Sequence, residues 1–288
     1  MEARLFCRKY RMATRLLTAA VGVVIAVLVL ALHNMIVLPI AAGLISGMLI
    51  YEYLRVNKLL RYHLTTVAAM IYALVHPMIQ VGMIARYRSI LSVAAVIAVL
   101  FDYVRHQKKM PEKTVFCALA GMFLIPNAMA AAVTLNNAHE QHGLAYLILA
   151  LGGAWIADSG AYFIGTFFGK QKLCPAISPK KTIAGFVGGI VSNIVFFILF
   201  CAVYLVIMTK KGVAVHMNWF TVVMLAMVTA VLGTLGDLAA STLKRQLGIK
   251  DFGNIMPGHG GMLDRFDSVL LVLPFFSAFV QATNFFEL

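Results

Sequence analysis

Apolar runs of about twenty residues recur along the whole chain, separated by short polar segments, and this repetition restricts the fold more than any other feature. A run of that length is what one helix needs to cross a bilayer. The candidate spans lie near residues 12–32, 35–54, 65–85, 89–104, 115–135, 144–168, 183–208, 219–240 and 269–286. With 61% hydrophobic and 12% charged residues, the chain is too apolar for an average soluble domain. The sequence therefore predicts an all-α polytopic membrane protein with about nine transmembrane helices.

The basic residues predict the orientation of these spans. If the N-terminus is cytoplasmic, 20 of the 24 Lys and Arg residues fall in cytoplasmic segments, and only Arg86, Arg88, Lys210 and Lys211 fall outside. This distribution follows the positive-inside rule, with the C-terminus outside. Topology accounts for the net charge of +13, so the charge does not indicate binding to nucleic acid. The same orientation places loops 170–182 and 241–268 on the cytoplasmic side.

One long polar stretch, Ser241–Ser268, interrupts the apolar pattern. It combines basic side chains, carboxylates and a glycine-rich turn. Its polar and turn-forming residues are Lys244, Arg245, Lys250, Asp251, Pro257, Gly258, His259, Gly260, Gly261, Asp264, Arg265 and Asp267. Cations and glycine N–H groups can surround phosphate, while carboxylates can hold a divalent ion. The stretch therefore predicts a site for an anion together with a metal.

Three carboxylates, Asp158, Asp237 and Asp264, lie next to or within predicted spans, where an unpaired charge is costly. Ser241 and Lys244 follow Asp237 at i+4 and i+7, so these three side chains share one helix face. If loop 241–263 folds back, Asp237 and Asp264 meet as ligands of a divalent ion. Asp267 or Ser268 could instead simply cap the last helix.

The sequence gives less support to zinc sites, disulfide bonds and nucleotide-binding P-loops. The four cysteines are scattered without paired spacing, which argues against zinc sites and disulfide frameworks. The segment Gly165–Lys170 lacks the spacing of a phosphate-binding P-loop. Gly165 with Gly169, and Gly185 with Gly189, follow a small-xxx-small pattern that lets helices pack closely. Lys180 and Lys181 are either topological charges or phosphate ligands.

The polar stretch resembles the signature of the phosphatidate cytidylyltransferase family, also called CDP-diglyceride synthases. Two further segments, Asp158–Lys170 and Ser178–Thr182 (SPKKT), resemble the same family, so the likeness covers roughly the C-terminal half. It implies an enzyme that joins CTP to phosphatidic acid, giving CDP-diacylglycerol and pyrophosphate. It also implies metal carboxylates at Asp237 and Asp264, which would hold Mg²⁺, with a second cation beside it as an alternative. The family often has acids where this chain has Ala184 and Ala240.

The resemblance also implies roles for individual residues. Asp237 and Asp264 would act in catalysis together with Lys244, Arg245, His259 and Arg265. His259 is expected to donate a hydrogen bond to phosphate, because a phosphate monoester needs no general base. The residues expected to bind substrate are Ser178, Lys180, Lys181, Thr182, Ser241, Lys250, Asp251, Gly260, Gly261, Asp267 and Asp158.

These expectations divide the chain into a scaffold half, residues 1–140, and a catalytic half, residues 141–288. The first half would serve as scaffold or as a homodimer interface. The protein is expected in the inner (cytoplasmic) membrane, among membrane lipids, with its active site facing the cytoplasm. One alternative is cytidylyl transfer to another lipid phosphate, such as that of an ether lipid. A polytopic transporter is the alternative from another class; its charges would line a path across the bilayer, whereas here they gather at span ends.

Overall fold

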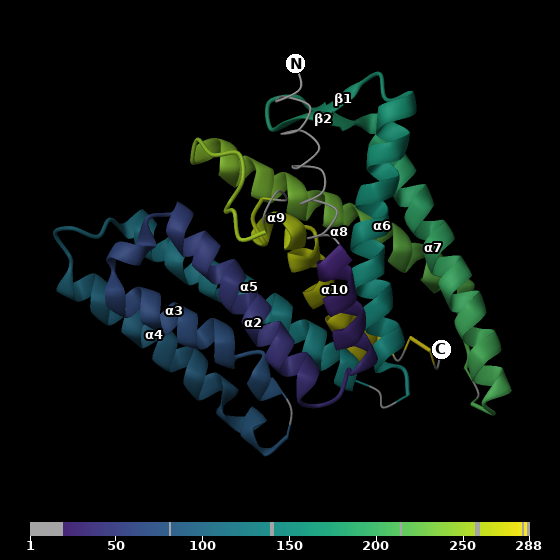
Figure 1. Ribbon diagram of the computed structural model, residues 1–288, viewed down its shortest axis with the longest axis horizontal. Helices are drawn as coiled ribbons and strands as arrows, with labels where there is room; N and C mark the ends of the chain where they lie inside the picture. The colour runs from purple at the N-terminus through teal and green to yellow at the C-terminus, as the bar shows by residue number, and fades with distance from the viewer. Residues whose placement is uncertain are drawn as a thin grey trace, which may run out of the picture. The chain divides into compact units, whose positions relative to one another are not determined.

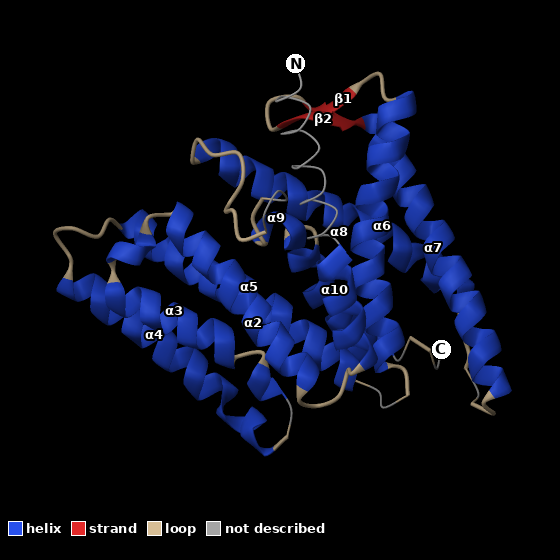
Figure 2. Ribbon diagram, in the orientation of Figure 1, coloured by secondary structure: helices blue, strands red, loops and turns tan. Residues whose placement is uncertain are grey.

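The structure, a computed structural model, describes residues 20–80, 82–138, 141–213, 215–256, 260–283 and 285–286. Within these ranges the regular structure is helical apart from one pair of short strands (Figure 2). The chain forms two compact units. The first holds the described residues up to Val133 together with Leu247–Phe266, and the second holds Thr134–Gln246 and Asp267 onward. The long polar stretch is therefore shared between the two units.

The helices of the first unit are labelled in Figure 1. They are α2 (Val37–Val56), η1 (Leu59–Arg61), α3 (His63–Val75), η2 (Met78–Gln80), η3 (Met83–Tyr87), α4 (Arg88–Arg105), α5 (Glu112–Asn137, which runs on into the second unit) and the single turn α9 (Leu263–Phe266). Helix α2 packs on α3, and α3 packs on α4. Asn34 stabilises the turn that leads into α2, since its Oδ1 accepts hydrogen bonds from the N–H groups of Ile36 and Val37.

The second unit contains α6 (Gly143–Phe168), β1 (Lys172–Cys174), β2 (Ser178–Thr182), α7 (Ile183–Lys210), α8 (Trp219–Gln246) and α10 (Val269–Thr283). Helix α6 packs against α7, α8 and α10, and α8 also packs against α7 and α10. The strands pair antiparallel, with Lys172 opposite Thr182 and Cys174 opposite Ser178. Figure 1 shows this hairpin at the ends of α6 and α7. It was not foreseen from the sequence.

Close packing between α6 and α7 confirms the small-xxx-small prediction. A Cβ atom added to Gly185 would lie 2.6 Å from the carbonyl oxygen of Ala161, and one added to Gly189 would lie 2.7 Å from that of Ala157. Real Cβ atoms essentially never approach so closely, so glycine is required for the backbones of α6 and α7 to lie this near.

Six helices in the described part are long and apolar enough to cross a bilayer, which agrees with a multi-pass membrane protein. They lie at Val37–Val56, Ile84–Arg105, Glu112–Asn137, Gly143–Phe168, Ile183–Lys210 and Trp219–Gln246. Three shorter apolar helices, Ala20–Ala31, His63–Val75 and Val269–Thr283, lie in the regions of the other three predicted spans. The total of nine spans and the orientation of the termini stay predictions.

One predicted span, 65–85, differs clearly from the helix that forms. Helix α3 ends at Val75, and two short 3₁₀ segments follow. Pro77 explains the difference: the His76 N–H still bonds to the carbonyl oxygen of Tyr72, but proline has no N–H to continue the series of helical hydrogen bonds.

Candidate active site

Three carboxylates from separate segments come together in the second unit. Asp158 lies on α6, Asp237 lies on α8, and Asp267 directly precedes Ser268 and α10; we call these three side chains the carboxylate cluster. Burial raises the pKa of Asp267, and the negative charges of Asp237 and Asp158 raise this pKa further. The Ser268 N–H donates a hydrogen bond to Oδ1 of Asp267 at 2.8 Å. The sequence predicted each of these carboxylates as a site residue, and the fold brings all three together.

A glycine on α8 allows this approach. A Cβ atom added to Gly236 would lie 2.5 Å from the carbonyl oxygen of Asp267, so a larger residue would push the Asp267–Ser268 backbone away from α8. The neighbouring Gly233 is less constrained, since the nearest atom to its added Cβ lies 3.7 Å away on Ser268. Gly236 therefore sets how close Asp267 lies to Asp237.

Two lysines neutralise the carboxylate cluster. The Nζ atom of Lys181 lies 2.6 Å from Oδ2 of Asp237, and the two side chains are only 23% and 26% exposed. Lys244 is buried, and its positive charge lowers the pKa of Asp267. A short, partly desolvated ion pair of this kind is stronger than one on an exposed surface.

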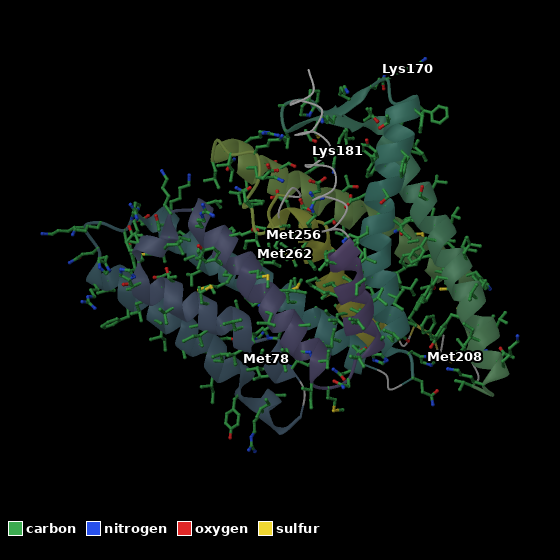
Figure 3. The ribbon with its side chains drawn as sticks, in the orientation of Figure 1. Met78, Lys170, Lys181, Met208, Met256 and Met262 are labelled. Atoms are coloured by element: carbon green, nitrogen blue, oxygen red, sulfur yellow. The ribbon has the colours of Figure 1, made fainter. Side chains whose placement is uncertain are left out.

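The β-hairpin positions the Lys181 side chain next to this cluster. Thr182 ends β2 and begins α7, where its Oγ1 accepts a hydrogen bond from the Gly185 N–H at 3.1 Å. Figure 3 shows Lys181 on β2 and Lys170 at the outer end of α6. Lys180 is exposed, whereas Lys181 turns inward. The hairpin thereby gives two adjacent lysines different environments, a distinction that the sequence alone did not provide.

The last turns of α8 carry the other predicted residues of this unit. Ser241 donates a hydrogen bond to Oδ1 of Asp237 at 3.2 Å, which confirms that these side chains share one helix face. Arg245 is exposed, and its Nε donates to the carbonyl oxygen of Ile177 in the hairpin turn at 3.3 Å. Ser178, at the start of β2, is half-buried.

The glycine-rich segment, which contains Gly253, Gly260 and Gly261, belongs to the first unit, and the Asp264 carboxylate holds part of its backbone. Its Oδ2 accepts hydrogen bonds from the N–H groups of Phe252 at 2.8 Å and Gly261 at 3.1 Å. Gly260 has a φ of +86°, a conformation that glycine adopts readily and other residues rarely do. In this arrangement the Gly261 N–H is directed at a carboxylate.

Lys250, Asp251 and Arg265 have exposed side chains at the borders of this segment. His259, predicted to contact phosphate, lies outside the described residues, as do Pro257 and Gly258. Sequence reasoning gave no role to Glu52 on α2, whose Oε2 accepts a hydrogen bond from the Leu263 N–H at 2.8 Å. The available signal was a single acid in an otherwise apolar helix of a chain with only 11 acidic residues.

The carboxylate cluster offers hard oxygen ligands of the kind that Mg²⁺ prefers. Its clustered negative charges also suit a cation, because like charges held together under burial are otherwise unfavourable. Among the described residues, however, no three His, Cys, Asp or Glu side chains are spaced to hold one ion. The predicted ligands Asp237 and Asp264 belong to different units, so their pairing stays a prediction.

Comparison with known proteins places this chain in a family. The model described as "Cytidylyltransferase family" matches residues 13–283. The phosphatidate cytidylyltransferase of Bacillus subtilis (strain 168) is 46% identical over 136 residues, which cover 47% of this chain and 47% of the relative. That of Staphylococcus epidermidis (strain ATCC 35984) is 44% identical over 135 residues, covering 47% and 48%. The matched region therefore spans about half the length of these relatives. Because the family model covers nearly the whole sequence, the chain belongs to the cytidylyltransferase family.

Proposed function

We propose that the chain transfers the cytidylyl group of CTP to phosphatidic acid, giving CDP-diacylglycerol and pyrophosphate. The observation that carries this proposal is the ion pair between Lys181 and Asp237 within the carboxylate cluster. It brings a lysine of the SPKKT segment to Asp237 of α8, so a residue of a segment that resembles the family meets a carboxylate that the resemblance implies. The relatives named phosphatidate cytidylyltransferase support the same activity.

In the proposed reaction, an oxygen of the lipid phosphate attacks the α-phosphorus of CTP in line. A new P–O bond forms, the bond between the α-phosphorus and its bridging oxygen breaks, and pyrophosphate leaves with the electron pair. Such phosphoryl chemistry depends on positioning and on neutralising charge. No side chain has to remove a proton, because the attacking phosphate is already largely ionised at neutral pH.

The basic residues would supply that neutralisation. Lys181 and Lys244 already face carboxylates within the second unit, and phosphate oxygens would compete with those carboxylates for the same cations. Arg245 and Lys180 are exposed and could meet the nucleotide first. We assign Lys250 and Arg265 of the first unit to the same task.

We further propose that Asp237 and Asp264 hold Mg²⁺, as the sequence predicts, with a second cation as an alternative. When bound, the ion would stabilise the negative charge that develops on the leaving pyrophosphate. Asp158 and Asp267 lie beside Asp237, and a bound cation would favour the ionised forms of their carboxyl groups. Asp237 in turn holds Lys181 and Ser241, so its carboxylate links the cation site to the phosphate-binding groups.

The cellular setting follows from the two substrates. We infer that the protein lies in the inner membrane with its site on the cytoplasmic side, where CTP is available. The acyl chains of the lipid can then stay in the bilayer while its headgroup enters the polar site. The N-terminal half would serve as a scaffold or a homodimer interface.

A direct transfer assay tests this proposal. Detergent-solubilised protein is mixed with phosphatidic acid, Mg²⁺ and CTP labelled at the α-phosphate, and label entering the lipid phase is counted. We expect the wild-type protein to place label in lipid. Absence of label with folded protein and phosphatidic acid, together with label on an ether-lipid phosphate, would identify the other lipid as the acceptor. Absence of label with both lipids would refute the proposed transfer.

A further inference from the structure

Glu52 is a buried acid in the last turns of α2, with a side chain only 1% exposed. Its Oε2 accepts a hydrogen bond at 2.8 Å from the N–H of Leu263, a residue 211 positions later in the sequence. Helix α2 also packs against α9, which begins at that leucine. A carboxylate that lies in an apolar helix therefore reaches the backbone of the glycine-rich segment.

The segment closes around this carboxylate at two glycines. A Cβ atom added to Gly261 would lie 2.7 Å from Oε2 of Glu52, and one added to Gly253 would collide with Oε1. Either contact is closer than real Cβ atoms allow. Both arms of the segment thus press their backbones directly against Glu52, at positions where only glycine leaves room.

Glu52 acts next to Asp264. The Cβ added to Gly261 would also lie 2.9 Å from Oδ2 of Asp264, so the two carboxylates approach the same glycine. Oε2 of Glu52 accepts a hydrogen bond from the Leu263 N–H. Oδ2 of Asp264 accepts hydrogen bonds from the N–H groups of Phe252 and Gly261. Oε2 of Glu52 and Oδ2 of Asp264 thus hold backbone N–H groups and no cation shared between these two carboxylates, which leaves the proposed pairing of Asp264 with Asp237 unaffected. The pair of carboxylates fixes the backbone on both sides of the segment.

Packing alone does not account for an acid at this position. Oε1 of Glu52 is buried and has no hydrogen-bond partner among the described residues. An unsatisfied buried oxygen lowers stability, and an apolar side chain of similar size would fill the space without that cost. The other oxygen, Oε2, explains why an acid stands here: it accepts a hydrogen bond from the N–H of Leu263, the residue immediately before Asp264.

We propose that Glu52 is a positioning residue of the transfer reaction, holding the backbone at Gly253, Gly261 and Leu263 so that Asp264 keeps the orientation it needs. This inference rests on the proposed function. It assigns a role in catalysis to a residue of the N-terminal half, outside every segment that resembles the family signature. Glu52 acts through the backbone of the segment and touches neither substrate.

The test compares three variants of the full-length protein in detergent. Glu52→Ala removes the anchor, and Glu52→Gln keeps an oxygen that can accept the Leu263 N–H. Asp102→Ala is the matched control: Asp102 is 2% exposed, lies on α4 in the same unit and accepts hydrogen bonds from Thr65, away from the glycine-rich segment. Hydrogen exchange of peptides covering 250–266 reports on the segment, while kcat and the KM for CTP report on the reaction.

For Glu52→Ala we expect exchange at least tenfold faster in this segment, and a kcat at least tenfold lower with the KM for CTP within threefold of wild type. Glu52→Gln should stay within threefold of wild type in all three quantities. Asp102→Ala should change neither the exchange of the segment nor kcat of the folded protein. Equal effects of Glu52→Ala and Asp102→Ala would overturn the inference, since a general loss of stability would then explain both. If wild type transfers no label, the proposed function fails, and the exchange comparison alone decides whether Glu52 anchors the segment.

Discussion

Replacing Lys181 by methionine is the most direct test of the site in the second unit. Methionine keeps an unbranched chain but removes the ammonium that lies 2.6 Å from Asp237. Both partners are about three-quarters buried, so the interaction is a partly desolvated, charge-assisted hydrogen bond. Such bonds contribute about 1.5–3 kcal/mol. At about 1.36 kcal/mol per factor of ten, this corresponds to a loss of about 10- to 150-fold in turnover if the pair is needed in the transition state.

The neighbouring Lys180 provides the matched control. It has the same charge and lies in the same strand, but its side chain is exposed. An exposed cation typically contributes about 0–1 kcal/mol, so Lys180→Met should cost at most about fivefold. Lys181→Arg, which keeps the positive charge, should recover part of the activity lost in Lys181→Met.

Label transferred from CTP to lipid measures all three variants, and thermal unfolding of each protein separates lost chemistry from lost structure. A second comparison uses Lys181→Met, Asp237→Asn and the double variant: if the pair is coupled, the two single effects on stability should not add. The reasoning is refuted if Lys180→Met loses as much activity as Lys181→Met, because burial of the ion pair would then have no bearing on turnover.

Three further results are expected. Asp264→Asn should lower label transfer below a tenth of wild type while the protein stays folded. Asparagine keeps an oxygen for the Phe252 and Gly261 N–H groups but loses the charge proposed to hold Mg²⁺. Activity above a tenth of wild type would contradict the metal role. Gly236→Val should lower the free energy of unfolding by about 1–3 kcal/mol through overpacking against Asp267. Gly233→Ala should have a smaller effect, because an added Cβ atom has more room there. Equal unfolding temperatures of the two variants would contradict this reading. Chelation with EDTA should abolish transfer and added Mg²⁺ should restore it, whereas activity that persists in EDTA would exclude the proposed ion.

The sequence predicted the features of this protein that depend on local pattern. Apolar runs located the long helices, because a bilayer crossing has a fixed length. The i, i+4 spacing placed Ser241 beside Asp237, and the small-xxx-small spacing predicted how α6 meets α7. Each of these follows from helix geometry within a short stretch of chain.

Other features depended on signals that were weak or distant. Helix α3 was predicted to continue to residue 85 because apolar residues follow Pro77, yet the helix ends at Val75. The hairpin of β1 and β2 has strands of three and five residues, too short to produce a clear alternation of apolar and polar side chains. The contact between Glu52 and Leu263 joins residues far apart in the chain, and no periodicity reports such a contact.

The separation of 211 residues between Glu52 and Leu263 has a consequence for biosynthesis. A ribosome adds about 5–20 residues per second, so about 10–40 s pass between synthesis of α2 and synthesis of the backbone N–H that its acid accepts. During that interval the newly made helix enters the membrane with its carboxylate lacking this partner, at a position where an unpaired charge is unfavourable. A nascent chain that stops before Leu263 keeps the acid in that state. The first unit therefore reaches its final structure only after Leu263 has been synthesised, even though α2 is made 211 residues earlier.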